Sequence, residues 1–217
     1  MIRVEGVRVA FGRTVALEHV DLEAGDGVVG VFGQNGSGKT TLLRVVAGLL
    51  QPSAGRVVLD GEPVWRGGED VRRRIGYAGH APGLYGQLTV AENVELFARL
   101  HGAPDGAAAQ AIDALGLGDR AGTRVGELSA GLRRRAGVAR ALVHDPDVLL
   151  LDEPYANLDD DAAELVSAAL RAWRGPERVA LVATHGAKRL KSFADAGLIL
   201  QRGRVVTYGR YRARTQA

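Results

Sequence analysis

The segment Gly33–Leu43, which reads GQNGSGKTTLL, limits the fold of this chain more than any other stretch. It follows a short β-branched run, Val28–Phe32, and it precedes an apolar-periodic stretch that is typical of a helix. Four residues match the pattern G-x-x-x-x-G-K-(S/T), namely Gly33, Gly38, Lys39 and Thr40. In such a loop the backbone N–H groups surround a phosphate chain, the lysine reaches the outer phosphates and the hydroxyl binds Mg²⁺. The alternative is a glycine-rich turn with an exposed lysine, but the strand–loop–helix context favours phosphate binding.

The composition excludes several other classes of protein. The 217 residues are 46% apolar, carry a formal net charge of +3 and include no cysteine. The charge is too small to indicate a nucleic-acid partner, and without cysteine neither disulfides nor thiolate metal sites can form. No apolar run approaches about 18 residues, and the N-terminus lacks an apolar secretory core. We therefore expect a protein that is cytosolic, or that reaches a membrane through a partner.

The first quarter of the chain alternates apolar and polar residues as strands do. This alternation in Ile2–Val9 and Val15–Leu22 predicts two strands that are joined by a short turn. Arg56–Leu59 and Val64–Trp65 flank an Asp-Gly dipeptide, which is typical of a hairpin. We therefore expect an N-terminal antiparallel β-subdomain.

Helix and strand signals alternate over the rest of the chain. Thr89 and Glu92 form a capping box, which predicts a helix that extends to about Leu100. Further helices are predicted over residues 107–115, 128–144 and 159–173, and buried strands at Val148–Leu151, Val179–Ala183 and Leu198–Leu200. This order is typical of an α/β fold with a mostly parallel sheet.

The order of these signals also predicts how the domain is divided. We expect a single domain over residues 1–217. Its core, with the β-subdomain, comprises residues 1–82 and 144–217, and residues 83–143 form an inserted α-helical subdomain.

Polar residues follow two of the predicted buried strands. Ligands bind at the carboxyl ends of parallel strands, so Asp152 is placed to hold Mg²⁺ and Glu153 to orient and deprotonate a water. The alternative is an acidic surface turn, but a phosphate loop requires a metal-holding acid, which favours the site. Thr184-His185 follows the next strand. From local sequence, His185 fits the start of a helix slightly better than a contact with the γ-phosphate.

Residues 126–142 read GELSAGLRRRAGVARAL. Ser129 is a favourable helix N-cap, and the small residues Ala130 and Gly131 leave the helix start open to an anion. The alternative is an ordinary capped helix with a basic solvent face at Arg133–Arg135. The position of this segment, shortly before Asp152, favours a role in the site.

Together these motifs resemble an ATP-binding subunit of an ABC transporter. The matching order spans nearly the full length: Phe11-Gly12, GQNGSGKTT (33–41), LSAGL (128–132), LLLDEP (149–154), ANLD (156–159) and TH (184–185). The resemblance implies a P-loop ATPase core with ATP and Mg²⁺ as cofactors. It also implies a head-to-tail pair of cassettes with two ATP molecules between them.

The resemblance implies a role for each matching residue. Phe11 would stack on adenine, and Ser129 and Gly131 would face the γ-phosphate bound to the partner cassette. Asp159 would communicate across the interface, and His185 becomes a γ-phosphate contact, against the preference from its local sequence. The nucleotide-binding set is Phe11, Gly33, Gln34, Asn35, Gly36, Ser37, Gly38, Lys39, Thr40, Thr41, His80, Ser129, Gly131 and Asp159. The catalytic residues are Glu153 and His185, and the metal ligands are Thr40, Asp152 and His80.

The chain departs from the family pattern at two positions. His80 stands where most members have a glutamine that senses Mg²⁺, and Leu132 replaces the signature glutamine. Either His80 contacts the water shell of the metal as a neutral imidazole, or metal sensing is weak and hydrolysis is slow. The stretch GHAPG at Gly79–Gly83, together with LSAG, resembles the ATP-binding subunit of the haem exporter of cytochrome c maturation. Leu132 does not match that subfamily either.

The resemblance leaves three functions to compare. The first is an ATPase that drives membrane-spanning transporter subunits, paired with a second, identical cassette and coupled through residues 80–88. Its cargo would be haem, or a drug or lipid in another exporter. The second is a nucleotide-gated module in which hydrolysis matters little. The third is a soluble family member that acts on DNA or ribosomes; the short helical insertion and the single cassette disfavour it, so we expect no nucleic-acid partner.

Overall fold

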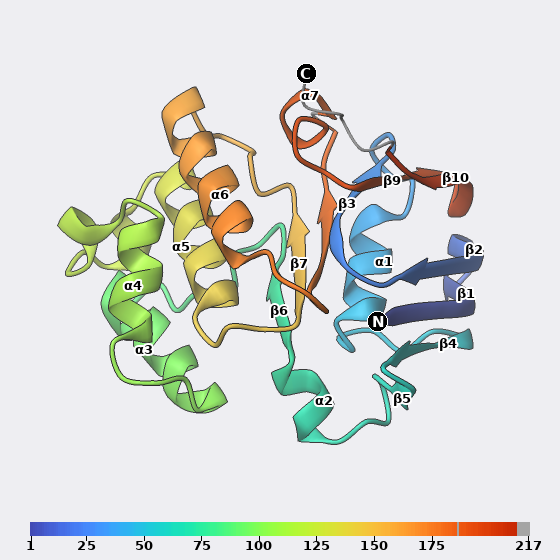
Figure 1. Ribbon diagram of the computed structural model, residues 1–217, viewed down its shortest axis with the longest axis horizontal. Coiled ribbons are helices and arrows are strands. Elements are labelled where there is room, and N and C mark those ends of the chain that lie inside the picture. The colour runs from blue at the N-terminus through green and yellow to red at the C-terminus, as the bar shows by residue number, and fades with distance from the viewer. Residues whose placement is uncertain (186, 212–217) are drawn as a thin grey trace.

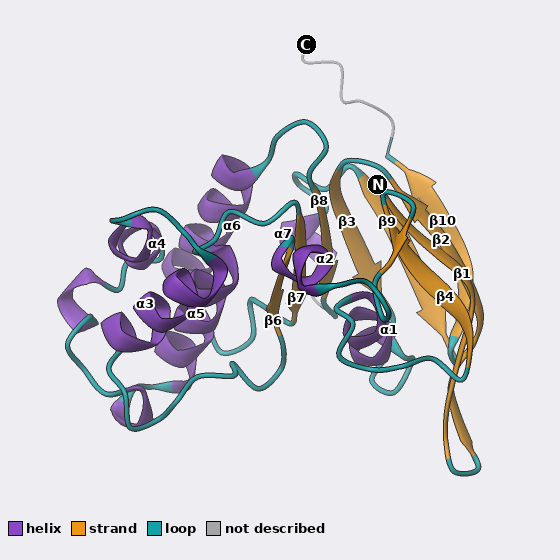
Figure 2. Cartoon of the chain, turned by 90° about the horizontal axis from the view of Figure 1, so that it is seen from below, coloured by secondary structure: helices purple, strands orange, loops and turns teal. Residues whose placement is uncertain are grey.

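The computed structural model describes residues 1–185 and 187–211 of the chain. Helix α1 (Lys39–Val46) lies between two β-sheets, and a group of helices lies beyond the larger sheet (Figure 1, Figure 2). This arrangement confirms the predicted α/β fold, with a mostly parallel sheet and an antiparallel sheet of N-terminal strands. Residues 212–217 of the predicted core lie outside the described residues.

The smaller sheet is antiparallel, in the order β2-β1-β4-β5. Its strands are β1 (Ile2–Phe11), β2 (Thr14–Ala24), β4 (Ala54–Leu59) and β5 (Glu62–Pro63). The strand predicted at Val64–Trp65 is wrong, because the turn has only two residues and pairs Leu59 directly with Glu62. The turn residues Asp60 and Gly61 have φ angles of 49° and 90°, as such a tight hairpin requires.

The larger sheet brings the ends of four neighbouring strands to one edge. Its order is β10-β9-β3-β8-β7-β6, and all neighbours are parallel except β10 and β9. The strands are β3 (Gly27–Phe32), β6 (Ile75–Ala78), β7 (Val148–Asp152), β8 (Val179–Ala183), β9 (Ala196–Gln201) and β10 (Arg204–Arg210). The phosphate loop follows β3. His185 follows β8, which is the neighbour of β3, and Glu153 follows β7, the next strand in the sheet.

Apolar cores cover both faces of the larger sheet. Along β7, the side chain of Leu150 packs on the face toward α1, whereas Leu149 and Leu151 pack on the opposite face. Burial on both faces explains why these strands appear in the sequence as continuous apolar runs rather than as alternating ones.

The remaining helices gather mainly on the face of the larger sheet opposite α1. They are α2 (Glu69–Arg73), α3 (Val90–His101), α4 (Ala107–Ala114), α5 (Ala130–Leu142), α6 (Asp160–Trp173) and α7 (Ala187–Leu190), with 3₁₀ turns at Gly118–Arg120 and Val125–Glu127. Helices α3, α4 and α5 pack on one another (Figure 1). The capping box at the start of α3 is confirmed, since Thr89 Oγ1 accepts from the Glu92 N–H and Glu92 accepts from the Thr89 N–H.

The basic solvent face considered for Arg133–Arg135 is wrong at its central residue. Arg134 is only 7% exposed. Positions 134, 138 and 141 fall on one face of α5, and Val138 and Ala141 on that face are buried. The phase of the helix therefore turns the Arg134 side chain into the protein.

A buried asparagine holds the loop before α3. Asn93 has no exposed surface, and its Oδ1 accepts from the Tyr85 N–H at 2.7 Å. Its Nδ2 lies 3.0, 3.3 and 2.9 Å from the carbonyl oxygens of Tyr85, Leu88 and Thr89. One side chain thus contacts four backbone polar groups of this turn and satisfies the Tyr85 N–H.

Replacement of Asn93 by leucine tests this role, because leucine has a similar volume but no polar atoms. We expect Asn93→Leu to lower the free energy of unfolding by about 2 kcal/mol, since the Tyr85 N–H loses its partner and three carbonyl oxygens each lose one of two contacts. Urea unfolding followed by circular dichroism measures this. Glu95→Gln on the same helix, which removes only an exposed ion pair with Arg99, should change stability by less than about 0.5 kcal/mol. A loss below about 1 kcal/mol for Asn93→Leu would contradict the assignment.

Candidate functional site

The loop between β3 and α1 has a backbone that only glycine adopts easily. Gly38, which caps α1, has a φ of 107°, and a Cβ there would lie 2.7 Å from the Ala16 carbonyl oxygen. Gly33 has a φ of 156°, and its Cβ would lie 2.4 Å from the Leu200 carbonyl oxygen. These contacts explain why the motif requires glycine at its two ends.

Two polar side chains are buried inside this loop. Lys39 is 7% exposed, and its Nζ donates to the carbonyl oxygens of Gly33 at 2.7 Å and Gln34 at 3.1 Å. Ser37 is also buried, and its Oγ has no hydrogen-bond partner among the described residues. An ammonium group, an unpaired hydroxyl and the start of a helix suit a multiply charged phosphate chain.

Two predicted metal ligands meet where α1 begins and β7 ends. Thr40 Oγ1 donates to Asp152 Oδ2 at 2.7 Å, although the two residues are 112 positions apart in sequence. A hydroxyl and a carboxylate are oxygen ligands of the kind that Mg²⁺ prefers. The donor set therefore fits this ion beside the phosphate loop.

Glu153 and His185 meet at the ends of β7 and β8. The Glu153 carboxylate Oε2 lies 2.9 Å from His185 Nδ1 and accepts from the His185 N–H at 3.3 Å. The Glu153 side chain is 15% exposed and that of His185 is 70% exposed, so the histidine faces solvent and the carboxylate is mostly covered. Glu153 also has a φ of 52°, in the sparsely populated left-handed region, which turns its side chain away from the strand direction.

These groups share one cavity of about 590 Å³. Its lining residues are Thr14, Val15, Ala16, Asn35, Gly36, Ser37, Gly38, Lys39, Thr40, Thr41, His80, Asp152, Glu153, Ala156 and His185. The structure thus brings His80 to the same cavity as the phosphate loop and the carboxylates. Phe11 is exposed at the end of β1 and does not line the cavity, but its strand partner Thr14 does.

Besides Phe11, the loop residues Gly33 and Gln34 do not line this cavity, and neither do three predicted residues at the starts of α5 and α6. Ser129 caps α5, its Oγ accepting from the Leu132 N–H at 3.2 Å, and Asp159 caps α6 through the Ala162 N–H at 2.8 Å. Gly131 approaches the loop before α6 closely, since a Cβ there would lie 2.8 Å from the Asn157 carbonyl oxygen. Ser129, Gly131 and Asp159 therefore do not reach the phosphate loop of their own chain.

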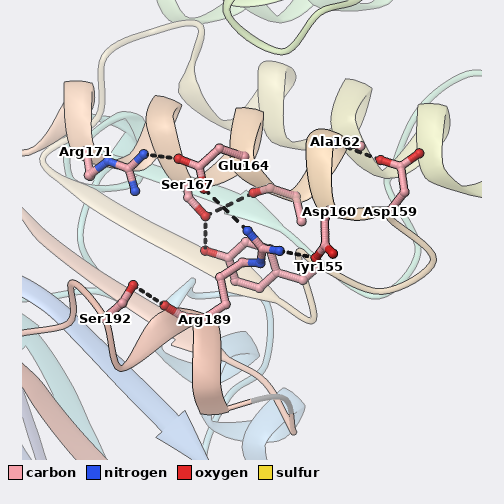
Figure 3. A network of polar contacts seen from close by, with 10 residues as sticks. Tyr155, Asp159, Asp160, Ala162, Glu164, Ser167, Arg171, Arg189 and Ser192 are labelled. Carbon is pink, nitrogen blue, oxygen red and sulfur yellow. Dashed lines mark hydrogen bonds and ion pairs between the residues drawn. The ribbon is translucent and has the colours of Figure 1, made fainter.

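A second cavity, of about 770 Å³, adjoins the first, because Glu153, Ala156 and His185 line both. A polar network joins α6 to α7 along this cavity (Figure 3). Arg189 donates to Asp160 Oδ1 at 2.5 Å and to Glu164 Oε2 at 3.4 Å. The sequence did not indicate this network, because its partners lie on separate helices and each appears locally as a solvated charge.

Arg134 is a further group at the site that sequence reasoning missed. Its Nη1 donates to the carbonyl oxygen of Gly79 at 3.0 Å and lies 3.4 Å from that of Asp152. Burial lowers the pKa of its guanidinium, whereas the charges of Asp152 and Glu153 raise it. The one sequence signal was its helical phase, which aligns it with Val138 rather than with the exposed face.

The family model described as ABC transporter matches residues 17–156, which is more than half of the chain. The ABC transporter ATP-binding protein NatA of Bacillus subtilis is 35% identical over 193 residues, 87% of this chain and 78% of that protein. The daunorubicin resistance ATP-binding protein DrrA3 of Streptomyces coeruleorubidus is 37% identical over 96% of this chain and 67% of its own length. The Nod factor export ATP-binding protein I of Burkholderia orbicola is 38% identical over 83% of this chain and 60% of its own length. Some relatives are thus considerably longer than this chain.

Solved structures agree with these relatives. The dimeric structure of MJ0796, a bacterial ABC transporter cassette, has a TM-score of 0.90 and 27% identity, covering 98% of this chain and 100% of that one. A post-hydrolysis state of the same cassette, bound to ADP and Pi, has a TM-score of 0.89. The chain therefore belongs to the ABC transporter family, as an ATP-binding subunit that hydrolyses ATP.

Proposed function

We propose that this subunit powers export by a membrane-embedded partner, and that its catalytic centre is the cavity beside the phosphate loop. The observation that carries the proposal is the meeting of two pairs there, Thr40 with Asp152 and Glu153 with His185. Among the described residues, no helix has the length and apolar character needed to cross a bilayer. We propose that the transport path lies in a membrane-spanning partner.

The proposed chemistry uses groups that already face the cavity. The loop amides and Lys39 bind the phosphates, and Phe11 stacks on the adenine ring from the end of β1. Mg²⁺, when bound by the Thr40 hydroxyl and the Asp152 carboxylate with His80 nearby, would screen the phosphate charge. Glu153 orients a water and accepts its proton, while His185 Nδ1 fixes the orientation of that carboxylate and its ring faces the γ-phosphate.

A second copy of the chain completes each site in this proposal. Ser129, Gly131 and Asp159 do not line the cavity of their own chain, which suits a role toward the ATP of a partner. The start of α5 presents backbone N–H groups beside Ser129, and helix starts attract phosphate. The likeness to a dimeric cassette supports the same pairing.

The membrane partner has a candidate docking groove between α1, β6 and the helices of residues 83–143, which we take as the helical subdomain. The groove holds a cavity of about 250 Å³, lined by residues that include Leu49, Tyr77, Phe97, His101, Arg140 and His144. Leu49, which lines this groove, is exposed, and so is Tyr85 within the predicted coupling segment 80–88. An apolar groove with a few polar groups suits a short helix of a partner.

Two kinds of transported substrate are candidates for this exporter. Relatives named for Nod factor export and daunorubicin resistance favour an exporter of drugs or lipid-like molecules. The stretch Gly79–Gly83, with His80 facing the cavity, favours haem export for cytochrome c maturation.

Glu153→Gln tests the hydrolytic role. We expect kcat of the assembled complex to fall by about 100-fold or more, because the amide cannot accept the proton, while the affinity for ATP changes little. Single-turnover hydrolysis and nucleotide binding measure the two quantities. Glu177→Gln, at an exposed residue outside the cavity, is the matched control. Equal hydrolysis by Glu153→Gln and the wild type would instead favour a nucleotide-gated module.

Thr40→Val tests the metal site. The methyl group keeps the side-chain volume but removes the hydroxyl that contacts Asp152. Calorimetry should show that adding Mg²⁺ strengthens ATP binding by the wild type, and that this gain falls about tenfold in the variant. Thr207→Val on β10, away from the cavity, should behave as the wild type. An unchanged gain in Thr40→Val would remove Thr40 from the ligand set.

Deletion of the coding sequence from its host separates the two cargoes. An exporter of drugs or lipid-like molecules should leave c-type cytochromes intact and raise sensitivity to toxic amphipathic compounds. Loss of covalently bound haem from c-type cytochromes, restored by the wild-type gene but not by one with Glu153→Gln, would establish haem export instead.

A further inference from the structure

Helix α5 contacts the backbone segment that carries His80 at several points. Arg140 Nη1 donates to the Gly83 carbonyl oxygen at 2.9 Å, and its Nη2 donates to that of Tyr77. Between these points, Gly137 packs against Pro82 so closely that a Cβ would lie 3.0 Å from the Pro82 Cβ. The segment from Tyr77 to Gly83 is thus held at several points by one helix.

Arg134 adds hydrogen bonds from α5 to the edge of the sheet that carries the proposed metal ligands. Its Nη1 donates to the carbonyl oxygen of Gly79, next to His80, and lies within reach of that of Asp152. These carbonyls follow β6 and end β7, two neighbouring parallel strands. A single guanidinium therefore links three elements: α5, the end of β6 and the end of β7.

Fold stability does not explain an arginine at this position. Burying a guanidinium costs free energy, and two carbonyl contacts offset only part of that cost. Burial lowers the pKa of Arg134, and the negative charges of Asp152 and Glu153 act in the opposite direction. The contacts that Arg134 makes are instead with backbone carbonyl oxygens at the ends of two strands beside the proposed site.

We propose that Arg134 is a positioning residue for the metal-binding edge, fixing the backbone of Asp152 and His80 relative to α5. This inference rests on the proposed Mg²⁺ site at Thr40 and Asp152. The start of α5 carries Ser129 and Gly131, which we propose face the nucleotide of the partner chain. Arg134 therefore connects the metal-binding edge of one nucleotide site to the helix that faces the other nucleotide site. Arg134 itself does not line the cavity beside the phosphate loop.

Arg135 offers a matched control on the same helix. Its Nη1 also donates to two carbonyl oxygens, those of Leu115 at 2.6 Å and Gly116 at 3.0 Å. Both acceptors lie just after α4, away from the cavity. Arg134→Gln and Arg135→Gln therefore remove equivalent contacts, of which only the first reaches the metal edge.

The experiment titrates Mg²⁺ against binding of a fluorescent ATP analogue, with thermal unfolding and ATP turnover measured in parallel. For Arg134→Gln we expect the Mg²⁺ concentration at half-maximal binding to rise at least tenfold and kcat to fall similarly, as loss of outer-shell support does. Binding without Mg²⁺ should stay within about twofold, because the phosphate loop is untouched. Arg135→Gln should lower the melting temperature but leave the Mg²⁺ dependence unchanged.

Arg134→Lys keeps the charge but shortens the side chain and loses the planar fork, so we expect a smaller shift in the same direction, about threefold. If Arg134→Gln does not fold, this variant decides the matter, and a wild-type Mg²⁺ dependence in it overturns the proposal. A folded Arg134→Gln with unchanged Mg²⁺ dependence also overturns it, as does an equal shift in Arg135→Gln. Absence of any Mg²⁺ dependence in the wild type would overturn the proposed metal site as well, which distinguishes the two failures.

Discussion

The hydrogen bond between Thr40 and Asp152 is the contact on which the arrangement of the site depends. It joins the first turn of α1 to the end of β7 across 112 positions of sequence. The contact forms because β3, β8 and β7 are parallel neighbours, so the segments that follow them emerge at one edge. The same register brings Glu153 to His185, and the extension to β6 brings His80. Sheet topology, rather than any local motif, therefore assembles the cavity.

Much of the fold was predictable because its elements have strong local signals. The strands β3, β7 and β8 are continuous apolar runs, and the capping box marks the start of α3. The strand β6 was missed because Gly76 interrupts its apolar pattern. A Cβ there would lie 2.1 Å from the Ala141 carbonyl oxygen, so the approach of α5 accounts for the glycine. The strand β10 was missed because it is an exposed edge strand with charged ends.

The site residues also divide into those that local sequence predicts and those that it does not. The phosphate loop and the residues Asp152 and Glu153 were predictable, because their position depends on a short backbone turn after a recognisable strand. The contact of Glu153 with His185 was not, since it depends on which strands are neighbours. Arg134 was considered part of a basic solvent face because a run of three arginines is typical of one. Only the phase of a helix whose packing was still unknown could have placed it inside.

The position of Arg134 gives α5 a role beyond supporting a fold. An apolar side chain would fill the same space without the cost of burying a charge, so packing alone favours leucine or methionine there. Arginine instead connects α5 to carbonyl groups at two strand ends. In the dimer proposed above, the start of α5, which Ser129 caps, would lie beside the nucleotide of the partner chain. Arg134 would then connect that helix to the metal-binding edge of its own site, so that one helix, with a polar contact near each end, would join the two nucleotide sites.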